Sequence, residues 1–313
     1  MSVAFLFPGQ GEQHPDMLAA LPEAPAVERT RAEARAALGD LRSLDTATAL
    51  RSTTSAQLAL LIAGVACARA LTEDHGVVPD FVAGHSVGAF AAAVTAGVLT
   101  FEEAIGAVRL RGELMQQTAQ DGRWGMAALV GLRLPVVRAL IQSTATDQDP
   151  LWIANVNAAD QVTLTGTNTA LHRAERAAAQ AGAQRLERLD IGVASHCPLQ
   201  KHTVEGLAAH LSAVPRRPQR IPYLSNTRGR RLQHDPGAVL DDLARSAGQP
   251  VQWHDAMRLM AELGVTRAVQ MQPGHVLCAL LHRIEPDMPT FALEQTPLAQ
   301  AASFARQTPG AQR

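Results

Sequence analysis

The chain has 313 residues, which is enough for one large domain or two modest ones with a packed core. Hydrophobic residues make up 47% and charged residues 18%, as in ordinary globular enzymes, and the formal net charge of -1 gives no argument for binding nucleic acid or a membrane. Three scattered cysteines, Cys67, Cys197 and Cys278, form no Cys-x-x-Cys pair, so we expect a reducing, cytoplasmic compartment and no metal site. We find no signal peptide and no run of about 18 apolar residues, and therefore expect no membrane span.

The first hundred residues alternate between predicted strands and helices. An apolar segment over residues 3–7 predicts a buried strand, which Pro8-Gly9 stops. Residues 54–71 are apolar nearly all round, so we expect this helix at the centre of the fold. The other elements expected here are a helix over 23–38, a strand over 78–83, a helix over 89–96 and a helix that Thr100 caps. Such alternation predicts a parallel sheet.

The pattern changes over residues 125–190, where we expect the order strand, helix, strand, strand, helix, strand. This order is that of a ferredoxin-like unit, which we expect as a small subdomain inserted into an α/β catalytic domain made of residues 1–124 and 191–313. The α/β pattern then resumes, and the tail beyond about Leu293 is expected to be partly loose. The later elements expected are helices over 200–211, 253–263 and 276–284 and strands over 221–225 and 266–271.

The segment Gly84-His85-Ser86-Val87-Gly88 lies between a predicted strand and a predicted helix. G-x-S-x-G in that setting predicts a nucleophile elbow, since glycines leave room for the sharp turn that presents the serine. A serine hydroxyl needs a base. His85 is one candidate, but the turn usually points neighbouring side chains apart. His196, in a polar break between a strand and a helix, is the better candidate.

Five segments, in order along nearly the whole chain, resemble the malonyl-CoA:acyl-carrier-protein transacylase family. They are residues 7–13, 84–88, 111–116, 195–199, and 249–253 followed by Gln272-Pro273-Gly274. The resemblance implies an α/β-hydrolase-like large domain with a parallel sheet and the inserted ferredoxin-like subdomain. It also implies ping-pong transfer of malonyl from CoA to the thiol of a carrier protein, without a metal or redox cofactor.

The resemblance further implies the roles of the reacting groups. Ser86 corresponds to the nucleophile and His196 to the general base. The backbone N–H groups of Gln10 and Val87 correspond to the oxyanion hole. Glycines beside Gln10 make physical sense there, because they let bare backbone donors approach the reacting carbonyl.

Two further positions correspond to the family pattern. Arg111 corresponds to the arginine that grips the malonyl carboxylate through two parallel hydrogen bonds, although spacing alone would make it a helix-end cation. Ser246 stands where the family usually has a side-chain amide, which supports the histidine largely through its main-chain carbonyl. A carbonyl is independent of side-chain type, so this support is compatible with serine.

Within the family, residues 45–66, 153–158 and 250–256 most resemble the epsilon subunit of malonate decarboxylase. The partners implied are malonyl-CoA, an acidic acyl carrier protein subunit and other malonate decarboxylase subunits. A fatty-acid or trans-acting polyketide malonyltransferase, a serine thioester hydrolase and a non-catalytic scaffold are the alternatives. The densest cationic region is either a carrier-docking surface or a set of solvated arginines, and it comprises Arg216, Arg217, Arg220, Arg228, Arg230 and Arg231.

Overall fold

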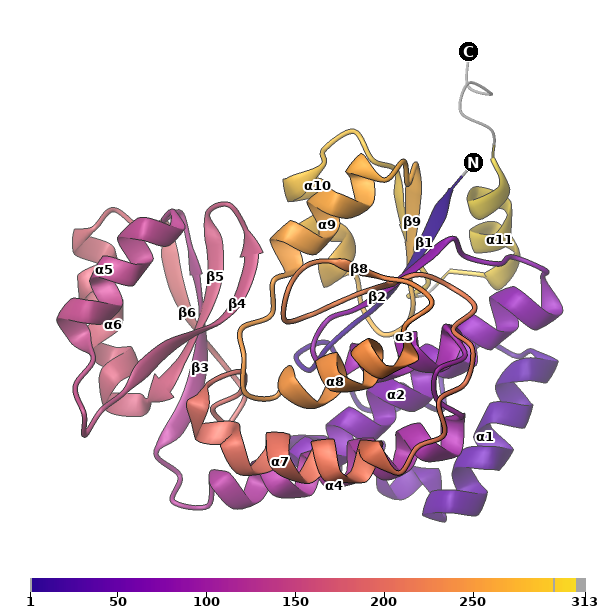
Figure 1. Ribbon diagram of the computed structural model, residues 1–313, viewed down its shortest axis with the longest axis horizontal. Helices are drawn as coiled ribbons and strands as arrows, with labels where there is room; N and C mark the ends of the chain where they lie inside the picture. Colours follow the sequence, from indigo (N-terminus) through magenta and orange to yellow (C-terminus); the bar gives the residue numbers. More distant parts are fainter. Residues whose placement is uncertain (1, 295, 308–313) are drawn as a thin grey trace.

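A computed structural model describes residues 2–294 and 296–307, which form two sheets with surrounding helices (Figure 1). The larger sheet has the order β10-β9-β1-β2-β7-β8. Its neighbours are parallel except for β7 and β8, which are antiparallel, so the predicted parallel sheet is confirmed. Its strands are β1 (Val3–Phe7), β2 (Phe81–Gly84), β7 (Tyr223–Leu224), β8 (Arg231–Leu232), β9 (Arg267–Gln270) and β10 (Thr290–Ala292).

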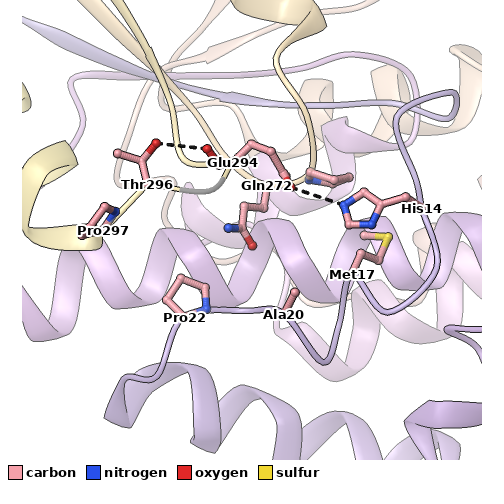
Figure 2. Close-up of a pocket in the computed structure, with 9 residues that line it drawn as sticks. His14, Met17, Ala20, Pro22, Gln272, Glu294, Thr296 and Pro297 are labelled. Atoms are coloured by element: carbon pink, nitrogen blue, oxygen red, sulfur yellow. Dashed lines mark hydrogen bonds and ion pairs between the residues drawn. The ribbon is translucent and has the colours of Figure 1, made fainter.

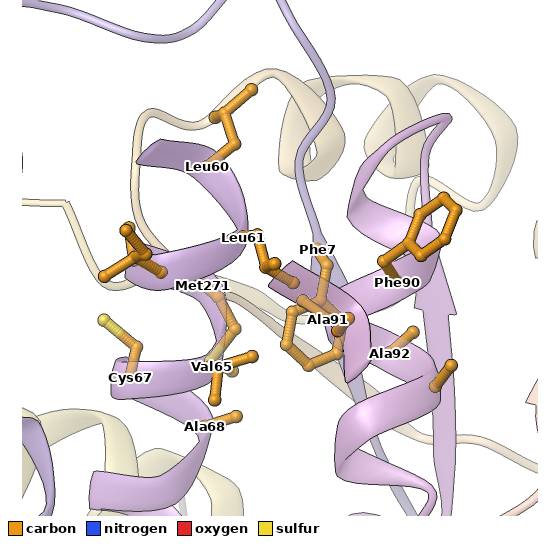
Figure 3. Packing of buried hydrophobic residues seen from close by; sticks show 14 of the residues in the cluster. Phe7, Leu60, Leu61, Val65, Cys67, Ala68, Phe90, Ala91, Ala92 and Met271 are labelled. Atoms are coloured by element: carbon orange, nitrogen blue, oxygen red, sulfur yellow. The ribbon is translucent and has the colours of Figure 1, made fainter. Parts of the chain in front are cut away.

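Helices cover both faces of this sheet, because successive strand residues point to opposite sides. Phe7 packs with α2 (Thr53–Arg69) and α3 (Gly88–Thr95) on one face, as Figure 3 shows. Leu6 lies on the other face, in the core formed with α9 (Trp253–Glu262) and α10 (Val276–Ile284). The remaining helices are α1 (Pro25–Leu38), α4 (Phe101–Thr118), α7 (Lys201–Ser212), α8 (Pro236–Arg245) and α11 (Leu298–Arg306), with 3-10 turns at Leu41–Ser43, Ala49–Arg51 and Pro198–Gln200.

Helix α2 continues through a π-helical turn to Asp74. The span Thr53–Asp74 has a mean hydropathy of 1.5 and is long and apolar enough, by length and composition alone, to cross a membrane. Gln57 and Arg69 interrupt this span, so it contains no continuous run of about 18 apolar residues. The structure buries 83% of the most apolar stretch of this span, because α2 lies among α1, α3 and α4. It is thus the central core helix that the sequence predicts.

The smaller sheet is antiparallel, with the order β4-β5-β3-β6, and lies at one end of the molecule (Figure 1). Its elements follow one another as strand, helix, strand, strand, helix, strand, as predicted. Two helices cover one face of this sheet and pack on apolar side chains such as Leu129 and Leu164. The other face lines the cavity that is described below. The elements are β3 (Trp124–Val130), α5 (Leu134–Thr144), β4 (Leu151–Ala158), β5 (Gln161–Thr167), α6 (Asn168–Gln180) and β6 (Arg185–Leu189).

Two features of the second half of the chain go beyond what the sequence predicts. Helix α8 was not predicted, although Asp235 caps its first turn and Pro236 occupies its first position, a combination typical of helix starts. The tail beyond Leu293 is not loose as far as it is described, because α11 buries Leu298, Ala301 and Ala302 in the main core. Residues 308–313 of that tail lie outside the described residues.

Candidate active site

The predicted elbow lies where β2 ends, at the carboxyl edge of the parallel sheet. Ser86 has a φ of 54°, a left-handed conformation that is strained for a residue with a side chain. A Cβ on Gly84 would lie 2.1 Å from the Gly88 carbonyl carbon, and one on Gly88 would lie 2.2 Å from the Phe7 oxygen. Both glycines of the motif are therefore required by backbone packing, and α3 begins directly at Gly88.

His196 reaches Ser86 from 110 residues further along the chain. Its Nε2 lies 2.8 Å from the Ser86 Oγ, and its Nδ1 lies 2.5 Å from the main-chain oxygen of Ser246. Because a carbonyl only accepts, Nδ1 must carry the proton, which leaves Nε2 as the acceptor for the Ser86 hydroxyl. The Ser246 hydroxyl donates to the Leu243 oxygen at 3.0 Å and takes no part in this chain of contacts.

Arg111, on α4, donates from Nη2 to the Ser86 Oγ at 3.1 Å. The guanidinium is 1% exposed, its Nε has no hydrogen-bond partner among the described residues, and burial lowers its pKa to about 10. Burial, followed by the charge of Arg111, lowers the pKa of His196 to about 3. The site therefore holds a neutral histidine and a desolvated cation on either side of one hydroxyl.

The structure adds Asn226, which the sequence interpretation missed. Its Oδ1 accepts the Ser86 N–H at 2.9 Å, and its Nδ2 donates to the Gly84 oxygen at 2.8 Å, so one amide holds both sides of the elbow. The backbone N–H of Asn226 donates to the buried carboxylate of Asp242 at 2.8 Å, and the Tyr223 hydroxyl donates to the same carboxylate at 3.0 Å. The only sequence signal was a polar residue directly after a short strand.

His85, the weaker candidate base, does not contact the Ser86 hydroxyl. Its Nε2 lies 3.1 Å from Oδ1 of Asn157 on β4, and its ring packs edge-on against Trp253 with centroids 5.4 Å apart. Desolvation lowers its pKa, and the Asn157 contact opposes that shift. His85 therefore connects the elbow to the small sheet.

The loop after β1 runs beside the elbow. A Cβ on Gly9 would lie 2.7 Å from the His85 oxygen, so glycine is needed for this approach. The backbone N–H groups of Gln10 and Val87 have no backbone or side-chain acceptor among the described residues, which leaves both available to an incoming oxygen. Their roles in an oxyanion hole are taken up below as part of the proposed function.

A cavity of about 370 Å³ lies between the two sheets, next to the elbow. The loop of residues 9–13 and the first turns of α10 line one side, and the open face of the small sheet lines the other. Asn155 is 7% exposed there and its Oδ1 has no hydrogen-bond partner among the described residues. The lining side chains are neutral or acidic, with carboxylates at Glu12 and Asp190. Such a cavity suits an uncharged, amide-containing chain better than a phosphate.

Comparison with known proteins places this site in a family. The model of the acyl transferase domain matches residues 4–288, so the chain belongs to the acyl transferase family and is an acyltransferase. The malonyl CoA-acyl carrier protein transacylase of Salmonella typhimurium is 37% identical over 304 residues, covering 96% of this chain and 98% of the relative.

Solved structures agree with that assignment. The malonyl CoA-acyl carrier protein transacylase of Coxiella burnetii has a TM-score of 0.92 at 31% identity, with 98% of each chain covered. A malonyl-transacylase in complex with a type II polyketide synthase acyl-carrier protein has a TM-score of 0.91 at 34% identity, covering 97% of this chain and all of the other. The family predicted from five sequence segments is thus confirmed.

Proposed function

We propose that this enzyme transfers malonyl from malonyl-CoA to the thiol of an acyl carrier protein. The observation that carries the proposal is the Ser86 hydroxyl, which lies 2.8 Å from a histidine nitrogen and 3.1 Å from a fully buried guanidinium. A serine hydrolase also needs the contact between the serine and the histidine, but it has no use for the buried guanidinium. The similarity to named malonyl transacylases, one of them in complex with its carrier, supports the same substrates.

The first half-reaction forms an ester on Ser86. His196 Nε2 takes the hydroxyl proton as Oγ attacks the thioester carbonyl, and the backbone N–H groups of Gln10 and Val87 receive the oxyanion. The C–S bond then breaks, and the leaving CoA sulfur takes the proton from His196. In the second half, the carrier thiol gives its proton to His196 and its sulfur attacks the ester carbonyl. The C–O bond to Ser86 then breaks, Ser86 Oγ takes the proton back from His196, and malonyl leaves as a thioester of the carrier.

Positioning of the base follows from its main-chain contact. The Ser246 oxygen accepts from Nδ1 of His196, so it keeps the ring in the tautomer that can accept from Ser86. We assign Ser246 this role through its carbonyl, without an acidic third member. The low pKa of His196 keeps the ring neutral and ready to accept a proton.

Arg111 provides the selection for malonyl in this proposal. A buried guanidinium with an unsatisfied Nε has hydrogen bonds to offer, and the planar fork matches a carboxylate. A malonyl group would pair with it, whereas an acetyl group would leave it buried and unpaired. Leaving one partner of a buried charge pair alone costs about 3–5 kcal/mol, which is ample for discrimination.

The finer description of the fold belongs to the same proposal. We describe the large unit, residues 1–124 and 191–313, as α/β-hydrolase-like because a serine elbow ends a central parallel strand and the histidine follows later in the chain. We describe residues 125–190 as a ferredoxin-like subdomain, since the order β4-β5-β3-β6 is antiparallel and two helices cover one face.

For the biological setting we propose the epsilon subunit of malonate decarboxylase, in a cytoplasmic complex with an acidic carrier subunit. The support is the resemblance of residues 45–66, 153–158 and 250–256 to the corresponding segments of that subunit. Fatty-acid and polyketide transacylases are the competing assignment. One similar structure is a malonyl-transacylase bound to a type II polyketide synthase acyl-carrier protein, and the similar Salmonella protein is a malonyl CoA-acyl carrier protein transacylase. Presenting purified enzyme, loaded with malonyl, to each class of carrier and measuring the transfer rate decides between them.

The arginine-rich region divides in the structure. Arg217 forms two hydrogen bonds with Glu103, at 2.7 and 2.9 Å, so its charge is already paired. Arg228, Arg230 and Arg231 are exposed on the β7–β8 hairpin, whose loop contains Asn226. We propose these three as the part of the region that an acidic carrier meets, since they are close in the chain to the elbow support.

The central experiment is intact-mass detection of a malonyl adduct. Wild-type enzyme mixed with malonyl-CoA should gain one malonyl group, and Ser86→Ala should gain none. A carrier with its prosthetic thiol should remove the adduct, whereas buffer alone should leave it in place. Rapid loss to water without a carrier would instead identify a thioester hydrolase, and absence of any adduct would refute the proposed function.

A further inference from the structure

We propose that Glu12 is a positioning residue that holds the loop carrying the Gln10 N–H against the start of α10. The inference rests on the proposed function, because it concerns the donor that receives the oxyanion. Glu12 follows Gly11 in the loop after β1, and its side chain turns away from the elbow toward a different part of the chain.

The contacts of this carboxylate are made with the entry to α10. Its Oε1 accepts the backbone N–H groups of His275 and Val276, at 2.6 and 2.7 Å. His275 is the N-cap of α10 but makes no side-chain cap of its own, so Glu12 supplies the missing cap from 263 residues away in the chain. An anionic acceptor at a helix start also matches the helix dipole.

The other carboxylate oxygen is tied to the sheet. Glu12 Oε2 accepts from Nε2 of Gln270 at 3.0 Å. Gln270 is fully buried on β9, where it pairs with Leu6 of β1, and its Oε1 accepts the Cys278 N–H at 3.0 Å. The Glu12 side chain is therefore held by both the strand next to β1 and the helix that follows that strand.

The backbone at Gly274 packs directly against the Glu12 carboxylate and leaves no space for a side chain there. A Cβ on Gly274 would lie within van der Waals overlap of Glu12 Oε1, and Gly274 has a φ of 71°. From the opposite side, the Gly274 N–H donates to Glu294 Oε2 at 2.8 Å. Figure 2 shows Glu294 beside Gln272 and His14 in a second pocket of about 290 Å³, outside the active site. The backbone N–H groups of residues 274–276 are thus all bonded to one of two carboxylates, Glu12 or Glu294.

Gln10 lies between two fixed points. On one side Gly9 packs against the His85 oxygen of the elbow, and on the other Glu12 is bonded to α10. Gly11 donates to Gln13 Oε1 at 2.6 Å, which adds a local turn but no tie to the rest of the protein. Glu12 is therefore the buried-side anchor nearest to Gln10, and His14 adds a more exposed contact two residues later, with its Nε2 3.4 Å from Glu294 Oε1. The Glu12 contact also joins two walls of the active-site cavity.

The test separates loop positioning from helix capping. We would compare Glu12→Ala and Glu12→Gln with Thr167→Ala, which removes the side-chain cap of α6 in the small subdomain, away from the loop. The measurements are the rate of malonyl-Ser86 formation in quenched reactions, malonyl-CoA affinity on a Ser86→Ala background, and thermal unfolding. Because a misplaced donor can cost about a hundredfold, we expect Glu12→Ala to lower the acylation rate at least tenfold.

Malonyl-CoA affinity should change less than threefold in Glu12→Ala, since the bound substrate carries no oxyanion, which develops only as Oγ attacks the carbonyl. Glu12→Gln keeps one acceptor oxygen and should fall between wild type and Glu12→Ala, which provides a readout if the alanine variant does not fold. Thr167→Ala should lose thermal stability while keeping the wild-type acylation rate.

Two results would overturn the inference. The first is a wild-type acylation rate in both Glu12 variants with reduced stability, which would make Glu12 a helix cap only. The second is weakened affinity at an unchanged maximal rate, which would make it part of the binding wall. Absence of the adduct in wild-type enzyme would refute the proposed function instead, so the two failures are distinguishable.

Discussion

Replacing Arg111 with methionine should stabilise the free enzyme and remove its preference for malonyl. The substitution deletes the charge and keeps an apolar side chain of adequate length in the same buried space. Among the described residues Arg111 forms no salt bridge; its Nη2 donates to the Ser86 hydroxyl, and its Nε has no hydrogen-bond partner. The free enzyme therefore carries a buried charge without a counter-ion, which the Ser86 hydrogen bond offsets in part and a substrate carboxylate would pair with.

The size of the effect follows from the pKa of Arg111. Burial lowers this pKa from 12.5 to about 10. At about 1.4 kcal/mol for each factor of ten in proton affinity, the shift corresponds to about 3 kcal/mol. A basic group whose pKa is lower in the folded than in the unfolded chain destabilises the folded state wherever it is charged in both. At neutral pH Arg111 is charged in both states, so the full penalty applies. Arg111→Met should thus raise the free energy of unfolding by about 1–3 kcal/mol.

The assay pairs thermal unfolding with acylation rates for malonyl-CoA and acetyl-CoA. For Arg111→Met, kcat/KM for malonyl-CoA should fall a hundredfold or more, the equivalent of about 3 kcal/mol, while kcat/KM for acetyl-CoA stays within a few-fold. Arg111→Lys is the matched control, because it keeps a charge but loses the planar fork.

Two outcomes would refute this reasoning. An unchanged ratio of malonyl to acetyl kcat/KM would show that the carboxylate is held by another group. A lower melting temperature in Arg111→Met would show that the free enzyme already offsets the buried charge, so that the guanidinium is not waiting for a partner.

Three further predictions concern the base, the elbow and the carrier. With the pKa of His196 at about 3, kcat/KM should stay level as pH falls to about 5. Arg111→Met should move the acid limb of the pH–rate profile to higher pH, because a nearby positive charge is gone. An acid limb near pH 6.5 in the wild-type profile would contradict this. Asn226→Ala should slow Ser86 acylation at least tenfold without weakening malonyl-CoA binding on a Ser86→Ala background, and an unchanged rate would exclude elbow support. Charge reversal at Arg230 and Arg231 should slow transfer to the carrier and spare Ser86 malonylation; equal loss in both half-reactions would remove the docking proposal.

The elbow could be predicted from sequence because its requirements are local. Gly84 and Gly88 meet the backbone at distances that exclude a side chain, and both lie within two residues of Ser86. The central helix was equally readable, since 54–71 is apolar on every face. Local sterics and continuous burial leave a signature in a short window of sequence.

The rest of the site depends on contacts between distant segments. Asn226 reaches Ser86 across 140 residues because β7 lies beside β2, and an asparagine after a strand otherwise signals only a turn. Arg111 has the spacing of an ordinary helix cation, and only resemblance to a family suggested a buried role. Glu12 likewise looks like one more polar loop residue until α10 is placed beside it.

The small sheet is joined to the large domain by main-chain bonds to the segment before α9, as well as by side chains. Val156 N–H donates to the Val251 oxygen at 2.8 Å, and Val251 N–H donates to the Ala154 oxygen at 2.9 Å. A salt bridge of 2.8 Å between Arg283 and Asp160 adds a second tie between α10 and the small sheet. A hinge between these parts would have to break all three contacts. These contacts hold the two walls of the cavity at a fixed spacing, and under the proposed function the donor and acceptor arms have to share that one space.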